Sequence, residues 1–276
     1  MVASSPDPAP APAPGLVARL RAAGCVFAED EAALLLGEGL APDDLEARVA
    51  RRVAGEPLEQ VLGWAAFRGR RVRVLPGVFV PRRRTEAMAA VALELLAGRA
   101  DPVLVDLCCG TGALAVVLGD AIPGAEVHAA DLDPVAVACA RLNLPARAVH
   151  EGDLFDALPP RLRGQVDLVA CNAPYVPTGR IALMPPEARD HEHRLALDGG
   201  ADGLDVHRRV AAAAPAWLAP GGALLLESSE EQADASAAAC AGAGMDVEVV
   251  TSPGTGSTVV VARTPDAAAG WTTGRS

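Results

Sequence analysis

Strand-like and helix-like segments alternate along most of the chain, and this alternation is the strongest constraint on its fold. Apolar runs of strand length lie at 103–107, 126–130, 165–171 and 223–228, and each is followed by residues with helical spacing or by a turn. Repeated strand–helix units give a mainly parallel sheet covered by helices. The sequence therefore predicts an α/β domain whose ligands lie at the carboxyl ends of the strands.

The remaining segments of this α/β portion are predicted from the same periodicities. The turn SPGTG joins two apolar runs and predicts an antiparallel hairpin at the end of the sheet. The other predicted elements are a short strand near 146–150, helices near 84–97, 203–217 and 229–241, helices starting at Gly112 and Pro134, and hairpin strands at 245–250 and 257–262.

Five regions are predicted along the chain. A Pro/Ala-rich start has the composition of an extended tail and cannot form a packed core. Apolar residues spaced three or four apart then indicate a small helical domain, and alternating Val and Arg indicate a β-hairpin with its turn at Pro76-Gly77. The predicted boundaries are 1–14 for the tail, 15–62 for the helical domain, 63–83 for the hairpin linker, 84–264 for the α/β domain and 265–276 for a second tail.

Composition excludes several classes of protein. The chain has 24 basic and 35 acidic residues, a net charge of −11, which disfavours non-specific binding to nucleic acids. No apolar run reaches the 18 residues of a membrane span, and the start of the chain lacks the pattern of a secretory signal. The six cysteines lack the C-x2-C spacing of a zinc site. We expect a cytoplasmic protein with reduced, buried thiols and no metal.

The first strand–helix turn of the α/β portion has the features of a nucleoside site. Asp106 ends the strand, and Gly110 and Gly112 leave room for a ligand against bare backbone at a helix amino terminus. Asp131 ends the next strand, where its carboxylate is placed to accept hydrogen bonds from a ribose diol. The alternative is a structural glycine turn beside a solvated aspartate. This pattern fits NAD as well as S-adenosylmethionine.

A second motif follows the strand at 165–171 and discriminates between these cofactors. The strand ends directly in Asn172-Ala173-Pro174-Tyr175, at the same edge of the sheet as the glycine loop. The Asn172 side-chain carbonyl and the Ala173 backbone carbonyl offer two acceptors to the hydrogens of a planar NH2 group. Such a nitrogen is a poor nucleophile, and holding both hydrogens directs its lone pair at a sulfonium methyl. No general base or metal is needed for this chemistry.

Taken together, several segments resemble one known family. The segments are VDLCCGTGALA, ADLDP, GDLFDALP, DLVACNAPYVPTG and MPPEARDHEHRLALDGGADGLDVHRR, preceded by EPLEQVLGWAAFRGRRVRVLPGVFVPRRRTE. They resemble the protein-glutamine amide methyltransferases that modify peptide chain release factors. The resemblance covers roughly residues 55–262.

The resemblance implies a fold, a cofactor and a reaction. The implied fold is a Rossmann-like S-adenosylmethionine-dependent methyltransferase sheet, mainly parallel with an antiparallel terminal hairpin, after a small helical domain that recruits the substrate. The implied reaction moves a methyl group to a glutamine side-chain nitrogen. The implied partner is a release factor, and we expect a monomer that binds neither a membrane nor nucleic acid directly. The predicted catalytic residues are Asn172, Ala173, Pro174 and Tyr175, and the predicted cofactor-binding residues are Asp106, Cys108, Gly110, Thr111, Gly112, Asp131, Leu132, Asp153, Leu154 and Asn172.

The chain departs from the family's pattern at three places. Ala173 replaces the first proline of Asn-Pro-Pro-Tyr, which keeps the carbonyl but loosens φ, so we expect retained but weaker activity. Cys108 replaces a glycine, so we expect a modest loss of cofactor affinity. Arg83 and Arg84 replace a proline and an acid of Arg-Pro-Glu-Thr-Glu, which changes the surface offered to a partner.

Several alternatives remain open from the sequence. The basic stretch from Arg68 to Arg84 is either a solvated hairpin face or a docking patch. His191-Glu192-His193 is expected to be a polar loop, because no third metal ligand follows at a telling spacing. The alternative functions are a glutamine methyltransferase of a ribosomal protein, a DNA adenine methyltransferase, an NAD-dependent oxidoreductase and a non-catalytic cofactor-binding module.

Overall fold

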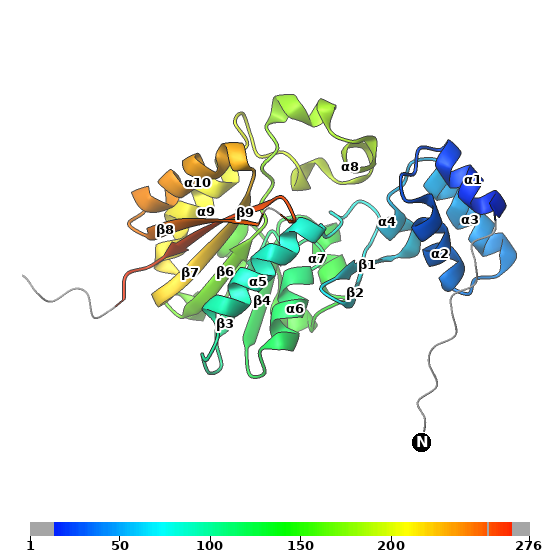
Figure 1. Cartoon of the computed structure of the whole chain (residues 1–276). Helices are drawn as coiled ribbons and strands as arrows, with labels where there is room; N and C mark the ends of the chain where they lie inside the picture. Colours follow the sequence, from blue (N-terminus) through cyan, green and yellow to red (C-terminus); the bar gives the residue numbers. More distant parts are fainter. Residues whose placement is uncertain (1–13, 253, 267–276) are drawn as a thin grey trace, which may run out of the picture.

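Figure 1 shows the structure, a computed structural model that describes residues 14–252 and 254–266. The predicted tails at 1–14 and 265–276 lie outside these residues, apart from residues 14, 265 and 266. No helix in the described ranges combines the length and the apolar character that crossing a bilayer requires.

A seven-stranded sheet forms the centre of the α/β portion. Its spatial order is β5-β4-β3-β6-β7-β9-β8, with parallel pairing from β5 to β7 and antiparallel pairing of β9 with both β7 and β8. This arrangement confirms the predicted mainly parallel sheet with an antiparallel terminal hairpin. The strands are β3 (Val103–Leu107), β4 (Glu126–Asp131), β5 (Val149–Glu151), β6 (Val166–Cys171), β7 (Leu218–Ser228), β8 (Asp246–Ser252) and β9 (Ser257–Arg263).

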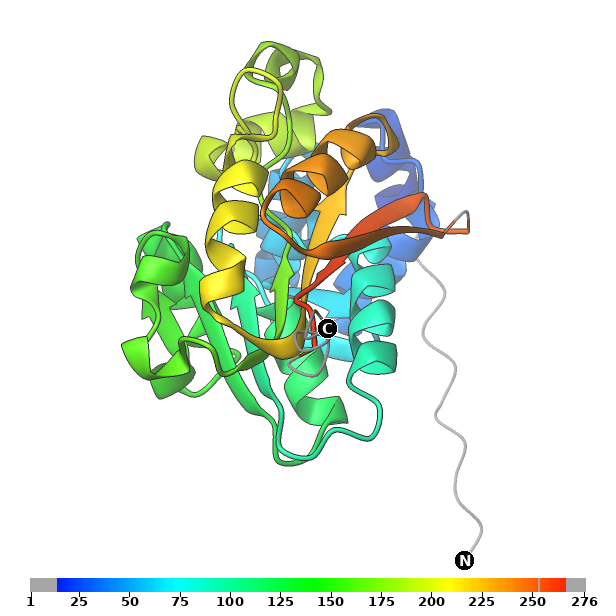
Figure 2. The ribbon, with the colours of Figure 1, turned by 90° about the vertical axis from the view of Figure 1, so that its left-hand side faces the viewer.

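Helices cover both faces of the sheet (Figures 1 and 2). Alternate residues of a strand point to opposite faces, so Leu104 packs among side chains of α5 and α6 while Val105 packs among those of α9 and α10. The result is a three-layer α/β domain with one apolar core on each side of the sheet. The helices are α5 (Glu86–Leu95), α6 (Ala113–Ala121), α7 (Pro134–Ala140), α9 (Asp205–Ala213) and α10 (Glu230–Gly242).

The N-terminal helices pack around a core of their own at one side of the molecule (Figure 1). Leu20, Leu35, Val49 and Val61 are buried in this cluster, which shares no buried residue with the cores of the sheet. The helices are α1 (Pro14–Ala22), α2 (Ala28–Gly37), α3 (Pro42–Val53) and α4 (Leu58–Leu62).

A two-stranded hairpin connects these helices to the sheet, but its turn is not where the sequence predicted it. β1 (Trp64–Phe67) and β2 (Arg70–Arg73) pair through the two-residue turn Arg68-Gly69, whose φ angles are 44° and 76°. Positive φ at both turn residues matches the twist of a hairpin. A turn does form at Pro76-Gly77, where the Val78 N–H donates to the Leu75 carbonyl at 3.2 Å and Gly77 has φ at 85°. It is not the turn of the hairpin, however, and residues 78–80 form no strand.

Short helical turns make up the rest of the described structure. The segment after β6 contains η5, α8 and η6, and it rises between the sheet and the N-terminal helices (Figure 1). The elements are η1 (Arg83–Thr85), η2 (Ala146–Ala148), η3 (Leu154–Ala157), η4 (Pro160–Leu162), η5 (Thr178–Leu183), α8 (Pro186–His191), η6 (Arg194–Ala196) and η7 (Ala214–Ala216).

A buried arginine ties the N-terminal helices to this segment. Arg52 on α3 is 5% exposed, and it donates to both carboxylate oxygens of Glu31 on α2 at 2.6 and 3.0 Å. It also donates to Glu187 on α8 at 2.6 Å. Three helices thus share one guanidinium group, and removing it leaves the Glu31 carboxylate buried without its cation.

Arg52→Ala is expected to lower the free energy of unfolding by about 3 kcal/mol, because breaking a buried ion pair leaves an uncompensated charge. Urea denaturation measures this change. The matched control is Arg19→Ala, which removes an exposed pair with Glu46 and is expected to change the free energy of unfolding much less. Equal effects of the two substitutions would contradict the role given to Arg52.

Candidate functional site

A cavity of about 800 Å³ lies at the carboxyl ends of β3, β4 and β6. Its floor comes from the turns that follow these strands, and its outer walls come from the segments 77–85 and 184–198. Small-molecule sites in proteins have volumes of roughly 300–1,000 Å³, so the cavity is large enough for a ligand the size of a nucleoside cofactor.

The structure brings all but one of the predicted site residues to this cavity. Gly112 is the exception: it precedes α6 with φ at 75°, and a Cβ there would lie 2.9 Å from Leu144 Cδ1. Glycine is required at position 112 because of the positive φ angle and because a side chain there would collide with Leu144. The predicted residues that line the cavity are Asp106, Cys108, Gly110, Thr111, Asp131, Leu132, Asp153, Leu154, Asn172, Ala173, Pro174 and Tyr175.

Asp131 connects the glycine loop to the next turn. Its Oδ2 accepts from the Gly110 N–H at 2.8 Å, and its Oδ1 accepts from the Asp133 N–H at 2.9 Å. Each carboxylate oxygen keeps a further lone pair, which can accept from the hydroxyls of a bound ligand. Burial raises the pKa of Asp131, while these backbone hydrogen bonds oppose the rise. Burial also raises the pKa of Asp106, which accepts from the Ala115 N–H at 3.1 Å.

Cys108 adopts a backbone conformation that favours glycine. Its φ is 55°, in the left-handed region, which costs an L-residue roughly 1–2 kcal/mol. The glycine that the related family's pattern has here is therefore explained by backbone geometry. A hydrogen bond with Cys171 and burial both raise the pKa of the Cys108 thiol, so the thiol is neutral at pH 7.

Asp153 and Leu154 lie at the far side of the cavity, after β5. Asp153 Oδ2 accepts from Arg209 at 2.6 Å, which leaves Oδ1 without a partner among the described residues. Leu154 begins η3 with φ at 50°, and its side chain packs beside the main core of the sheet. An acceptor oxygen beside an apolar side chain suits a flat ring that carries an amino group.

The turn after β6 presents two free acceptors to the cavity. Asn172 Nδ2 donates to the Thr85 hydroxyl oxygen at 3.3 Å, so the Asn172 carbonyl oxygen points the other way. Within residues 14–252 and 254–266, no hydrogen bond reaches Asn172 Oδ1 or the Ala173 backbone oxygen. Gln232 fixes the turn by donating to the Tyr175 carbonyl at 3.0 Å.

Tyr175 forms a wall of the cavity beside these acceptors. Its hydroxyl donates to Glu227 Oε1 at 3.5 Å, and the Arg84 guanidinium lies 5.4 Å from its ring centroid. Burial raises the pKa of the Tyr175 phenol, and the nearby Glu227 charge raises it further. The phenol is therefore neutral, and its role in the cavity is to present a flat surface.

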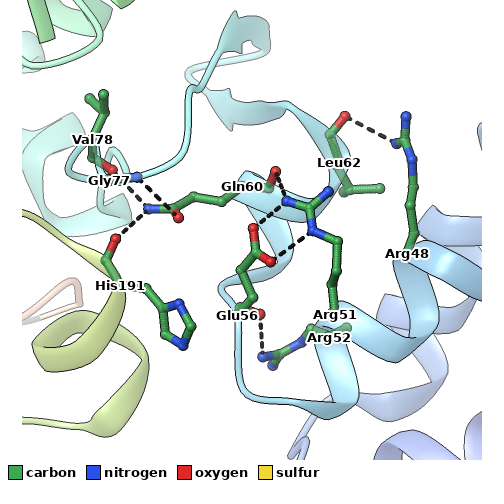
Figure 3. Close-up of polar contacts among 9 residues, drawn as sticks. All are labelled: Arg48, Arg51, Arg52, Glu56, Gln60, Leu62, Gly77, Val78 and His191. Atoms are coloured by element: carbon green, nitrogen blue, oxygen red, sulfur yellow. Dashed lines mark hydrogen bonds and ion pairs between the residues drawn. The ribbon is translucent and has the colours of Figure 1, made fainter. Parts of the chain in front are cut away.

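One buried glutamine holds the two outer walls of the cavity together (Figure 3). Gln60 on α4 is 4% exposed; its Nε2 donates to the Val78 carbonyl at 3.1 Å and to the His191 carbonyl at 3.2 Å. Its Oε1 accepts from the Gly77 N–H at 3.4 Å. The His193 N–H also donates to the Gly77 carbonyl at 2.8 Å. The N-terminal helices thus contribute to the shape of the cavity without lining it.

The basic stretch predicted from Arg68 to Arg84 is largely paired with carboxylates. The ion pairs are Arg70 with Asp120 at 3.1 Å, Arg71 with Glu38 at 3.4 Å, Arg82 with Glu192 at 2.5 Å and Arg84 with Glu227 at 3.0 Å. Arg82 and Arg84 line the cavity, so part of this stretch is neither a solvated face nor a surface patch.

Within the polar segment His191-Glu192-His193, Glu192 has a structural role. The Glu192 carboxylate is buried and accepts from the Val80 N–H at 3.1 Å as well as from Arg82. His193 hydrogen-bonds Asp133 through Nδ1. Among the described residues, no group of three or more His, Cys, Asp or Glu side chains is arranged to hold a metal ion.

Three residues around the site were not identified from the sequence: Gln60, Thr85 and Glu227. Thr85 lies in the segment RRRTE, which was noted only for its arginines. Glu227 lies near the carboxyl end of β7, next to β6 in the sheet, and this position was a signal that could have identified it. Gln60 carried no such signal, because its partners are backbone atoms of distant segments.

Comparison with known proteins gives a consistent family assignment. The family profile described as "Methyltransferase small domain" matches residues 69–184. The chain is 42% identical to the release factor glutamine methyltransferase of Streptomyces coelicolor over 69% of this chain and 71% of that protein. It is 41% identical to the 4-amino-L-phenylalanine/4-methylamino-L-phenylalanine methyltransferase of Streptomyces pristinaespiralis over 67% of this chain and 65% of that protein.

A solved structure supports the same fold. A methyltransferase from Pyrococcus furiosus superposes with a TM-score of 0.52 and 16% identity, over 80% of this chain and 99% of that one. At this identity the likeness shows a shared fold and does not bear on the substrate.

Asp131→Ala is expected to weaken S-adenosylmethionine binding about 10- to 100-fold, because hydrogen bonds to a charged group contribute roughly 1.5–3 kcal/mol. Isothermal titration calorimetry measures the Kd. Asp167→Ala is the matched control, since Asp167 binds Arg99 and Val103 away from the cavity. An unchanged Kd for Asp131→Ala would show that this carboxylate does not bind the cofactor.

Proposed function

The chain belongs to the family of release factor glutamine methyltransferases, and we propose that it methylates the glutamine of the Gly-Gly-Gln motif in a peptide chain release factor. In this reaction a methyl group moves from S-adenosylmethionine to the side-chain amide nitrogen. The observation that carries the proposal is the pair of free acceptors, Asn172 Oδ1 and the Ala173 carbonyl, on the wall of the cavity.

The residues of the glycine loop and its neighbours fit S-adenosylmethionine. Bare backbone at Gly110 leaves open space on the cavity side, where a Cβ would approach no atom closer than 3.9 Å. Asp131 has lone pairs for the ribose hydroxyls, and Asp153 Oδ1 is free to accept from the adenine amino group beside Leu154. The cofactor, when bound, supplies an electrophilic sulfonium methyl group.

The acceptor residues act by orientation. An amide nitrogen shares its lone pair with its carbonyl group and is a poor nucleophile. The carbonyl oxygens of Asn172 and Ala173 each accept a hydrogen bond from one N–H group of the glutamine amide, which fixes the orientation of that amide. This arrangement favours a pyramidal nitrogen whose lone pair points toward the methyl group. Transfer of the methyl group from the sulfonium would leave a neutral thioether, S-adenosylhomocysteine, and the methylated nitrogen would release one proton to water. Pro174 and Tyr175 shape the turn and its wall.

Ala173 supports this mechanism because it keeps the carbonyl that the mechanism uses. The residue is 1% exposed, so packing restricts its backbone in place of the proline ring. Retained but weaker activity, relative to an enzyme with proline at this position, remains the expectation.

We propose further that the protein works as a cytoplasmic monomer that binds a release factor and neither a membrane nor nucleic acid directly. The net charge of −11 supports this proposal. The ion pairs made by Arg70, Arg71, Arg82 and Arg84 support it too, since they leave fewer cations free to bind phosphate.

Asn172→Ala is expected to lower methyl transfer about 10²- to 10³-fold, as removing one oriented hydrogen-bonding group from an active site does. S-adenosylmethionine affinity is expected to stay nearly unchanged. Transfer is measured with radiolabelled cofactor and a bacterial release factor, and the Kd by calorimetry. Gln165→Ala removes an exposed side-chain amide and serves as the control. A fully active Asn172→Ala enzyme would contradict the mechanism.

The same assay distinguishes the proposed acceptor from its alternatives. Mass spectrometry is expected to find one added methyl on the glutamine of the Gly-Gly-Gln peptide. Ribosomal protein, duplex DNA and 4-amino-L-phenylalanine are supplied as separate acceptors, because each also carries a nitrogen conjugated to a π system. Transfer to one of these alone would reassign the substrate, and cofactor binding without any transfer would indicate a non-catalytic module.

A further inference from the structure

We propose that Thr85 and Glu227 are positioning residues that determine which way the Asn172 amide faces. The inference rests on the proposed function, because it concerns the acceptor that Asn172 presents to the glutamine. An asparagine amide has nearly the same shape after a 180° rotation that exchanges its oxygen and its nitrogen. Only one of the two orientations places an acceptor in the cavity.

Thr85 selects this orientation through its hydroxyl group. It is 4% exposed, it lies in η1 at the cavity wall, and its oxygen accepts from Asn172 Nδ2 at 3.3 Å. A hydroxyl group can accept from one neighbour while it donates its single proton to another. The direction of the hydrogen bond to Asn172 therefore depends on where the Thr85 proton goes.

Glu227 attracts that proton. It lies on β7 next to Leu226, which is in register with Cys171 of β6, so Glu227 and Asn172 follow paired positions on adjacent strands. The Glu227 side chain is 1% exposed, and its Oε2 is buried with no hydrogen-bond partner among the described residues. The Thr85 hydroxyl is the neighbouring donor that can satisfy this oxygen, and its proximity lowers the pKa of Glu227. An ionised carboxylate only accepts hydrogen bonds. A Thr85 hydroxyl that donates its proton to Glu227 keeps its lone pairs free to accept from Asn172 Nδ2 at 3.3 Å.

Changing Glu227 into a donor would reverse this chain of hydrogen bonds. A protonated glutamate, or a glutamine, can donate to Thr85, which then directs its own proton to Asn172. The Asn172 amide would rotate to offer its oxygen to Thr85 and its NH2 group to the cavity. Two NH2 groups would then face each other, and the glutamine would lose one of its two acceptors.

The surroundings of Glu227 set its protonation state. Burial raises the pKa of Glu227, while hydrogen bonds from Thr85, Arg84 and Tyr175 and the Arg84 charge lower it. His207 on α9 lies behind Tyr175, with ring centroids 6.4 Å apart, and burial lowers its pKa to about 4. The neighbouring strand β9 places Val259 opposite Glu227. Arg84 is thus the cation that faces this carboxylate directly, and the related family's pattern has an acid at that position.

The test compares kcat for a Gly-Gly-Gln peptide at saturating cofactor and peptide. Thr85→Val has nearly the same shape without the hydroxyl, and Glu227→Gln exchanges an acceptor for a donor. Each is expected to lower kcat about 10- to 100-fold, the effect of one oriented hydrogen bond to a polar group. Thr85→Ser keeps the hydroxyl and is expected to keep most of kcat. Thr264→Val, which removes a threonine hydrogen bond to Ala219 far from the cavity, is the control.

The pH profile separates orientation from a purely structural role. In the wild-type enzyme kcat is expected to fall toward acid pH, with a midpoint above the usual glutamate range, because Glu227 gains a proton there. Glu227→Gln is expected to have a uniformly low kcat without this acid limb. Wild-type kcat in Glu227→Gln, or an unchanged acid limb, would overturn the inference.

A measurement without an acceptor distinguishes failure of the inference from failure of the proposed function. The side-chain NH2 protons of Asn172, assigned by comparison with Asn172→Ala, are followed by NMR hydrogen exchange. Slow exchange in the wild-type enzyme and faster exchange in Thr85→Val are expected. If these exchange rates are found but the enzyme methylates no release factor, the inferred orientation of the Asn172 amide is supported and the proposed substrate is wrong. Equal exchange rates in the two proteins would overturn the inference.

Discussion

Parallel pairing of β3, β4 and β6 is the constraint on which the site depends. Because parallel strands end at the same edge of the sheet, residues far apart in sequence meet there. The Gly110 loop follows β3, Asp131 is the last residue of β4, and Asn172 follows β6. The two apolar cores that hold the sheet therefore also fix the distances between the cofactor and acceptor parts of the cavity.

The outer walls of the cavity depend on a second kind of interaction. Segments 77–85 and 184–198 contain only short helices and helical turns, so many of their backbone groups need partners elsewhere. Gln60 and Glu192, both buried, supply several of these partners, and Arg52 adds an ion pair to Glu187. The N-terminal helices therefore support the acceptor side of the cavity through buried polar contacts, in addition to any part they play in recruiting a substrate.

Features that depend on local sequence were predictable, and features that depend on distant partners were not. The glycine loop, Asp131 and the turn at Asn172 follow from strand ends and residue types. The contact between Thr85 and Asn172 joins residues 87 positions apart, and nothing in the sequence near either residue indicates it. The hairpin turn was misplaced because Pro76-Gly77 is a stronger turn signal than Arg68-Gly69. The glycine preference at position 108 became clear only from its φ angle.

In the proposed reaction, Asn172 Oδ1 and the Ala173 carbonyl accept hydrogen bonds from both N–H groups of the glutamine amide. A crystal structure with S-adenosylhomocysteine and a Gly-Gly-Gln peptide would show these contacts. The glutamine nitrogen is expected about 2.9 Å from each of the two oxygens. A glutamine nitrogen bound by neither oxygen, or an Asn172 amide rotated away from Thr85, would contradict it.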